Sequence, residues 1–269
     1  MIRITCVLGL LLALQSTPQG DATPLPGAHA HNDYQHARPL LDALDQGFTS
    51  VEADIFLVGD KLLVAHEQKE IRPERTLQSL YLQPLKERVV RNGGRVYRDE
   101  PRFVLLIDLK TAAEPTYRRL HEVLTEYRDM LTTFGPAGRK EGAVLVVVSG
   151  AQPLEQMQAQ AVRCAGCDGR LNHLDSELSA DLIPMISDNW GNCFSWRGVG
   201  PMPPDQRRKL EDIVSKSHVK GRLVRFWATP DLPSLARDAV WQELLSAGVD
   251  LINTDDLQGL RRFLLEHRR

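Results

Sequence analysis

Five polar residues lie on or directly after segments that otherwise have the apolar composition of buried β-strands. They are His31, Glu52, Asp54, His66 and Asp108. Strands bury apolar side chains, so acidic residues in them need a partner of opposite charge. Three carboxylates that meet at one point would hold a divalent cation, and two histidines beside them would supply an acid and a base. These residue types are suited to the cleavage of a phosphate ester.

The polar residues fall into pairs at positions i and i+2. Side chains alternate between the two faces of a strand, so both members of such a pair point the same way. Four strands carry these pairs: His29 with His31, Glu52 with Asp54, Asp108 with Lys110, and Arg225 with Trp227. Hard carboxylate oxygens favour Mg²⁺ or Ca²⁺. Lys110 and Arg225 could then hold the phosphate oxygens.

Short apolar runs predict about eight strands separated by helices. The expected strands are residues 28–31, 50–56, 103–109, 143–148, 183–186, 223–227 and 249–252, with a weaker one at 169–174. The expected helices are residues 39–46, 117–131, 205–218, 241–247 and 257–264. An extra strand at 61–65 and a long polar insertion at 68–102 make the first units irregular. The pattern predicts an α/β fold with a single irregular TIM (β/α)8-type barrel, whose active site lies at the C-terminal strand ends.

The composition is that of an ordinary globular protein. The chain has 269 residues, of which 42% are hydrophobic and 25% charged, and its formal net charge is −2. This charge does not favour nucleic acid as a partner. The three cysteines after the N-terminal segment are Cys164, Cys167 and Cys193; we expect structural roles for them, and their pairing stays open.

The N-terminal segment has the layout of a signal peptide. Arg3 is followed by an apolar run at 4–14 and a polar, Pro-rich stretch at 15–26. We therefore expect a signal peptide at residues 1–22, with an uncleaved anchor as the alternative, and a barrel domain at 27–269. This predicts a secreted or periplasmic protein.

Four sequence stretches resemble the PLC-like phosphodiesterase superfamily, which includes glycerophosphodiester phosphodiesterases, phosphatidylinositol-specific phospholipase C and sphingomyelinase D. They are Ala30-His31-Asn32, Val51-Glu52-Ala53-Asp54, Leu63-Val64-Ala65-His66-Glu67 and Ile107-Asp108-Leu109-Lys110. The run His31-Asn32-Asp33-Tyr34 and the segments 187–190 and 225–231 are similar to the altered inheritance of mitochondria protein 6 branch.

The resemblance implies particular roles for the matched residues. Glu52, Asp54 and Asp108 would bind one divalent cation, and His31 and His66 would form the acid-base pair. Lys110 and Trp227 would line the site. Apart from the resemblance, Arg225 and Asn32 are also expected to bind the substrate. The superfamily usually has Arg-Gly where this chain has Asn32-Asp33, which puts a glycerol-specific pocket in doubt.

The expected function is a metal-dependent phosphoric diester hydrolase, or a cyclising phosphodiesterase, acting on a glycerophosphodiester or phospholipid-like substrate. A non-catalytic ligand-binding barrel that keeps the metal site is the alternative. A glycosidase is disfavoured, because carboxylates at i and i+2 on one strand lie about 6.5–7 Å apart at the backbone and cannot flank a sugar bond on opposite faces. No protein partner is expected. Trp190, Phe194 and Trp196 could contact a membrane, or could form a local cluster beside the barrel rim.

Overall fold

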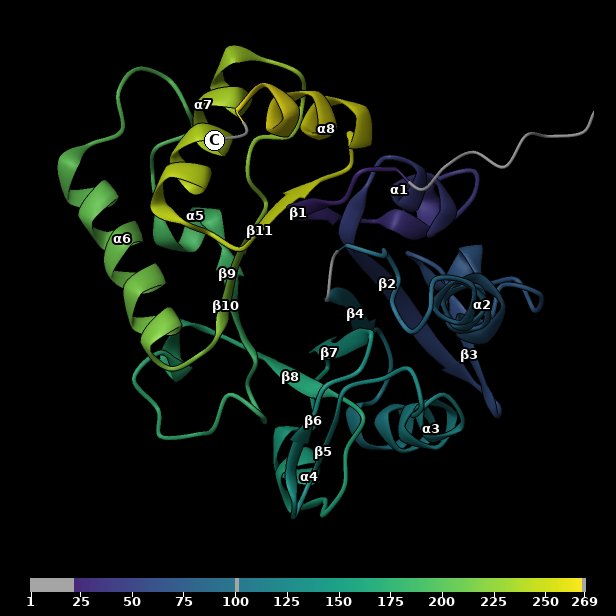
Figure 1. The fold of residues 1–269 in the computed structure, drawn as a ribbon. Helices are drawn as coiled ribbons and strands as arrows, with labels where there is room; N and C mark the ends of the chain where they lie inside the picture. Colours follow the sequence, from purple (N-terminus) through teal and green to yellow (C-terminus); the bar gives the residue numbers. More distant parts are fainter. Residues whose placement is uncertain (1–21, 100–101, 268–269) are drawn as a thin grey trace, which may run out of the picture.

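Eight parallel strands close into a barrel with helices around its outside (Figure 1). The computed structural model describes residues 22–99 and 102–267. The strand order is β1, β11, β10, β9, β8, β7, β4, β2, and a further pairing of β1 with β2 closes the ring. The predicted TIM-type barrel is confirmed.

The bounds of the elements are as follows. The barrel strands are β1 (Leu25–Ala30), β2 (Phe48–Val58), β4 (Phe103–Leu109), β7 (Val144–Gly150), β8 (Gly166–Gly169), β9 (Met185–Asn189), β10 (Leu223–Trp227) and β11 (Leu251–Thr254). The strands outside the ring are β3 (Lys61–Val64), β5 (Thr133–Gly135) and β6 (Gly138–Lys140). The α-helices are α1 (Leu41–Asp45), α2 (Gln83–Arg91), α3 (Ala113–Glu126), α4 (Leu154–Ala159), α5 (Trp190–Cys193), α6 (Pro204–Val219), α7 (Leu235–Ala247) and α8 (Leu257–Glu266).

The alternation of side chains divides the buried residues into two groups. Outward-facing strand residues such as Val51, Ala53 and Ile107 are fully buried in the large core that includes the helices. A smaller apolar cluster joins inner positions of the barrel strands: Val104, Leu106, Leu145, Val147, Met185 and Leu251. Phe134 of β5, outside the ring, belongs to the same cluster. Further along the same strands, towards their C-terminal ends, the inner positions become polar. The barrel therefore has an apolar floor beneath a polar mouth.

The hairpin of β2 and β3 brings a second histidine to this mouth. β3 runs antiparallel to the end of β2, with Ile55 opposite Val64. The chain returns along β2, and the Ala65 amide donates to the Asp54 carbonyl at 3.3 Å. His66 follows directly, which explains how a residue outside the barrel strands reaches the site. The predicted extra strand at 61–65 is thus confirmed.

One expected strand is wrong, and the insertion contains a helix that was not expected. The eighth strand is Gly166–Gly169, not residues 169–174, where a 3-10 turn lies at Leu171–His173. Its two glycines are required by close packing, because a Cβ on Gly166 would lie 2.4 Å from Pro184 and one on Gly169 would lie 2.5 Å from Ile183. A strand with so few side chains leaves little hydrophobic pattern. In the insertion at 68–102, the polar composition conceals helix α2.

The aromatic residues after β9 form a packed cluster. Trp190, Phe194 and Trp196 are buried, and the Trp190 ring lies 5.6 Å from that of Phe226 on β10. The Trp190 indole also donates to the Trp196 carbonyl at 2.8 Å. The three side chains thus pack as the local cluster that was one of the two sequence-based interpretations, and contact of the protein with a membrane stays a prediction.

The N-terminal expectation falls almost entirely on residues 1–21, which lie outside the described residues. Across residues 22–99 and 102–267, no helix is long and apolar enough to cross a membrane. In the same part of the chain Cys164, Cys167 and Cys193 are buried free thiols.

Candidate active site

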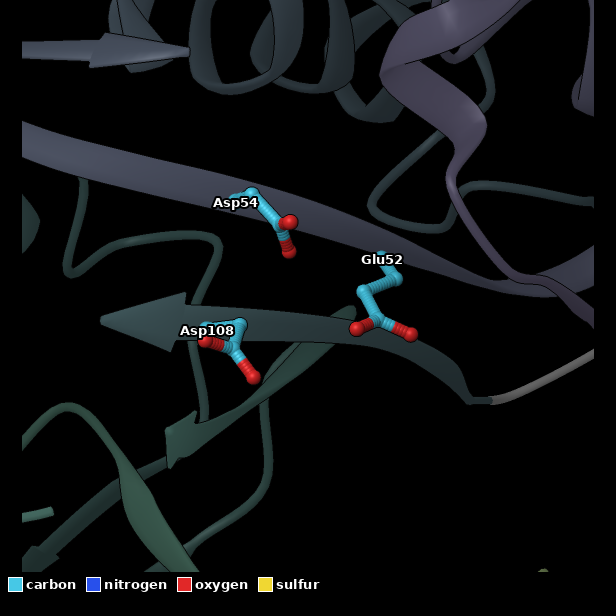
Figure 2. A group of neighbouring side chains, drawn as sticks. All are labelled: Glu52, Asp54 and Asp108. Atoms are coloured by element: carbon cyan, nitrogen blue, oxygen red, sulfur yellow. The ribbon is translucent and has the colours of Figure 1, made fainter. Parts of the chain in front are cut away.

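Two neighbouring strands bring three carboxylates together at the mouth of the barrel (Figure 2). Glu52 and Asp54 lie on β2, and the register of β2 against β4 places Asp54 directly opposite Asp108. One carboxylate oxygen from each residue lies within 4.8 Å of the others. This spacing is compatible with joint coordination of a single cation by oxygen ligands.

Asp54 is the most buried of the three carboxylates. Its Oδ2 lies 2.6 Å from the Tyr34 hydroxyl and 3.0 Å from Lys110 Nζ, whereas its buried Oδ1 has no hydrogen-bond partner among the described residues. Burial, reinforced by the charge of Glu52, raises the pKa of Asp54 to about 6. An unpartnered buried carboxylate oxygen is costly unless a cation or a proton meets it. The donor set therefore fits a hard divalent cation.

Glu52 is held by charged and polar neighbours inside the barrel. Arg225 Nη2 on β10 lies 3.0 Å from Glu52 Oε2, and His29 Nε2 lies 3.4 Å from the same oxygen. Burial alone would raise the pKa of Glu52, but the guanidinium of Arg225 and the hydrogen bond from His29 hold it well below its usual range. Arg225 also donates to Asn253 at 2.8 Å. It is thus the counter-charge of Glu52; phosphate binding by Arg225 stays a prediction.

Asp108 depends on a glycine in the next strand. Burial raises the pKa of Asp108, and Lys110, whose Nζ lies 3.1 Å from Asp108 Oδ1, opposes this effect. Gly150 ends the adjacent strand β7 with φ +71°, and a Cβ there would lie 2.3 Å from Asp108 Oδ1. Glycine is needed at this position both for its backbone conformation and for the room it leaves to the carboxylate.

His31 directly follows β1, and its ring is oriented by Asp255, which directly follows β11. Its Nδ1 lies 2.8 Å from Asp255 Oδ1, and Asn32 Nδ2 lies 3.3 Å from the same carboxylate oxygen. Burial would lower the pKa of His31, but the hydrogen bond to Asp255 and the charge of Glu52 outweigh it, so the pKa is raised. Because Nδ1 is engaged, Nε2 is the nitrogen that can exchange a proton with a ligand.

His66 lies on the exposed loop after β3 and packs on Tyr34. The two rings are stacked with centroids 6.2 Å apart and an interplanar angle of 19°. The Tyr34 hydroxyl is also 2.6 Å from Asn32 Oδ1, in addition to its contact with Asp54. Tyr34 therefore joins three predicted site residues.

One cavity of about 240 Å³ brings all nine predicted site residues together. Its lining comprises His31, Asn32, Glu52, Asp54, His66, Asp108, Lys110, Ser149, Arg170, Arg225 and Trp227. Two of the loops that follow site residues turn sharply, because Asn32 and Ala228 have positive φ values of 47° and 55°. For alanine this left-handed conformation costs roughly 1–2 kcal/mol.

Sequence reasoning missed several residues at this mouth. Arg170 Nη1 donates to Asp168 Oδ2 at 2.6 Å, and Ser149 donates to the same oxygen at 2.9 Å. Asp168 and Arg170 form an i, i+2 pair like the others, so the same alternation could have identified them had the strand been placed correctly. Asp255 gave a weaker signal, as the acid directly after the last strand.

Two family models match the chain. One, described as an AIM6-like phosphodiesterase domain, covers residues 18–165. The other, described as the glycerophosphoryl diester phosphodiesterase family, covers residues 224–258.

Relatives match across most of the chain. An altered inheritance of mitochondria protein 6 homolog from Arthroderma benhamiae is 31% identical, over 89% of this chain and 84% of that protein. Altered inheritance of mitochondria protein 6 from Eremothecium gossypii is 27% identical, over 90% of this chain and 70% of that protein.

Two solved structures share the barrel. A calcium-dependent phosphoinositol-specific phospholipase C from Pseudomonas sp has a TM-score of 0.54 at 14% identity, covering 86% of this chain and 90% of that one. A glycerophosphoryl diester phosphodiesterase from Parabacteroides distasonis has a TM-score of 0.52 at 14% identity, covering 90% of this chain and 87% of that one. At this identity the likeness shows the fold alone.

The names of the relatives contradict the expected location. They refer to mitochondria, whereas residues 1–22 led us to expect a secreted or periplasmic protein. That expectation is wrong. It relied on a short apolar run after a single arginine. Such a run is defined by composition alone, and composition does not distinguish one cellular destination from another.

Proposed function

Because the chain belongs to the AIM6-like phosphodiesterase family, we propose that it is a metal-dependent phosphoric diester hydrolase acting on a glycerophosphodiester or a phospholipid-like substrate. The observation that carries the proposal is the single cavity in which His31 and His66 lie beside the three carboxylates. A barrel that only bound a ligand could use the carboxylates for a cation but would have no need of both histidines.

Glu52, Asp54 and Asp108 would hold one divalent cation. When bound, the cation would polarise a phosphoryl oxygen and offset the negative charge that develops in the transition state. Carboxylate oxygens alone do not distinguish Mg²⁺ from Ca²⁺. The calcium dependence in the name of the Pseudomonas phospholipase C is a reason to test Ca²⁺ first.

The two histidines would move the protons. One would accept a proton from the attacking hydroxyl, and the other would donate a proton to the leaving oxygen, each worth about 10²–10⁴-fold in rate. Asp255 would keep the His31 ring oriented with Nε2 towards the substrate, because it occupies Nδ1. Water as the attacking group would give a phosphomonoester, whereas a hydroxyl of the substrate itself would give a cyclic phosphate.

The cavity supports recognition of a small polar head group. Its volume of about 240 Å³ is below the roughly 300–1,000 Å³ of a pocket for a drug-sized ligand. Lys110 and Arg170 offer positive charge at the lining, and Asn32 and Trp227 offer an amide and an indole. A lipid substrate would therefore insert its phosphate and head group and leave its acyl chain outside.

Phosphorus NMR tests the proposal directly. Metal-stripped protein is incubated with lysophospholipids and glycerophosphodiesters, and Ca²⁺ or Mg²⁺ is then added. We expect cation-dependent loss of the diester signal, which is absent in Glu52→Gln and reduced by at least about 10²-fold in His31→Ala and His66→Ala. Calorimetry is run in parallel, since both histidine variants should still bind the cation. Cation and ligand binding without turnover by any variant or ion would instead establish a binding barrel.

A further inference from the structure

The carboxylates of the candidate site already have cationic partners within the chain. Arg225 lies 3.0 Å from Glu52, and Lys110 Nζ lies 3.0 Å from Asp54 Oδ2 and 3.1 Å from Asp108 Oδ1. Three negative side chains thus face two positive ones, and the third cation of the lining, Arg170, is paired with Asp168. One negative charge is therefore in excess. The excess disfavours the approach of a phosphodiester anion to the cavity.

The two cations differ in how firmly they are held. The Arg225 side chain is 4% exposed, and a second hydrogen bond ties it to Asn253 on β11. The Lys110 side chain is 30% exposed and directly follows the end of β4, at the cavity mouth. A lysine ammonium on a flexible stem moves more easily than a buried guanidinium with two fixed partners. Lys110 is therefore the cation that can leave.

Lys110 competes for the oxygens that a divalent cation would use. Such a cation lies about 2.0–2.6 Å from its carboxylate ligands. Lys110 Nζ is already within 3.1 Å of oxygens from two of the three acids. A divalent cation and an ammonium this close repel each other strongly in a partly buried site. Asp54 Oδ1 is buried and has no hydrogen-bond partner among the described residues, so it is an oxygen of the site that Lys110 leaves unpaired.

We propose that Lys110 is a resident counter-ion that a divalent cation displaces, and that the released ammonium then binds the phosphate group of the substrate. The inference rests on the proposed function, since it assumes that Glu52, Asp54 and Asp108 hold the cation. Binding of a divalent cation would change the net charge of this group of side chains from −1 to +1. A site with a charge of +1 attracts a phosphodiester, which carries one negative charge. Cation binding and phosphate binding are then coupled, because the first event frees the residue that serves the second.

A structure of the wild-type protein grown with Ca²⁺ or Mg²⁺ tests the displacement. We expect the cation between the three carboxylates and Lys110 Nζ more than about 4 Å from both Asp54 and Asp108. A bound cation with Lys110 still paired to both acids would overturn the inference and leave the proposed function intact. If neither ion binds, the proposed metal site fails and the inference fails with it.

Calorimetry of Lys110→Met supplies a second measurement that needs no turnover. Without a counter-ion to displace, this variant should bind Ca²⁺ or Mg²⁺ at least about tenfold more tightly than the wild type. It should also lose most of the gain in affinity for inorganic phosphate that Mg²⁺ confers on the wild type. Lys216→Met is the matched control, because Lys216 pairs with Asp212 on the exposed side of α6. Equal cation affinity in wild type and Lys110→Met would overturn the inference.

Discussion

Asp33 is a buried acid that anchors the segment carrying His31. Its Oδ2 accepts hydrogen bonds from the Leu40 amide at 2.5 Å and the Tyr81 hydroxyl at 2.8 Å, and its Oδ1 is buried without a partner among the described residues. Burial raises the pKa of Asp33 from 3.8 to about 7, although both hydrogen bonds oppose the change. The folded protein therefore favours the protonated carboxyl group.

This preference makes the stability of the protein depend on pH. A group whose pKa is raised on folding contributes stability that is fully present below its unfolded pKa and lost as the pH rises through its folded pKa. For Asp33 the window runs from 3.8 to about 7. The pKa rises by about three on folding, and a rise of one corresponds to about 1.36 kcal/mol. The free energy of unfolding therefore falls by about 4 kcal/mol across the window.

Asp33→Asn isolates this contribution. The amide oxygen can accept from Leu40 and Tyr81, but the amide nitrogen would replace the unpartnered Oδ1 at a cost of about 1–3 kcal/mol that does not depend on pH. The variant should therefore be less stable than the wild type near pH 4. Between pH 4 and pH 8 its free energy of unfolding should rise by about 4 kcal/mol relative to that of the wild type. Asp42→Asn is the control, because hydrogen bonds from Arg38 outweigh burial and lower the pKa of Asp42.

Urea unfolding between pH 4 and pH 8 measures the difference. The free energy of unfolding is taken from tryptophan fluorescence for the wild type, Asp33→Asn and Asp42→Asn at each pH. Comparison of two proteins at the same pH cancels the contributions of the other titrating groups. Parallel curves for wild type and Asp33→Asn would refute the assignment of a raised pKa to Asp33.

Two further predictions concern the site. Asp255→Asn removes the carboxylate whose hydrogen bond helps to raise the pKa of His31 against burial, so the ring should titrate at lower pH by NMR and turnover should fall about 10- to 100-fold. An unchanged titration would contradict this role. Gly150→Ala places a Cβ 2.3 Å from Asp108 Oδ1 and should weaken cation binding at least about tenfold by calorimetry. Gly59→Ala shares the positive φ but has nothing within 4 Å of its Cβ, so its cation affinity should match the wild type.

The barrel and the faces of its strands could be predicted because they depend on local periodicity. Val51, Ala53 and Ile55 alternate with Glu52 and Asp54, and a period of two requires the acids to share a face whatever the rest of the chain does. Parallel strands then place their C-terminal ends at one edge. This local rule was enough to predict that the carboxylates lie together. Only the register between β2 and β4 had to come from the tertiary structure.

The partners of these acids were decided by contacts between distant parts of the chain. Arg225 and Glu52 are 173 positions apart, and His31 and Asp255 are 224 apart. The pairing of β1 with β11 brings His31 and Asp255 together, and no local sequence pattern predicts this contact. For the same reason the sequence did not predict that Arg225 pairs with Glu52; its contact with phosphate stays a prediction.

The sequence by itself determined which residues can do chemistry and which side of each strand they occupy. The tertiary structure alone decided how their charges are balanced. Asp54 and Asp108 are adjacent because β2 and β4 pair in a register that sets them opposite each other. Lys110 reaches both because it follows Asp108 by two residues at the strand end. Charge balance depends on distance and burial, and both arise only when the barrel closes.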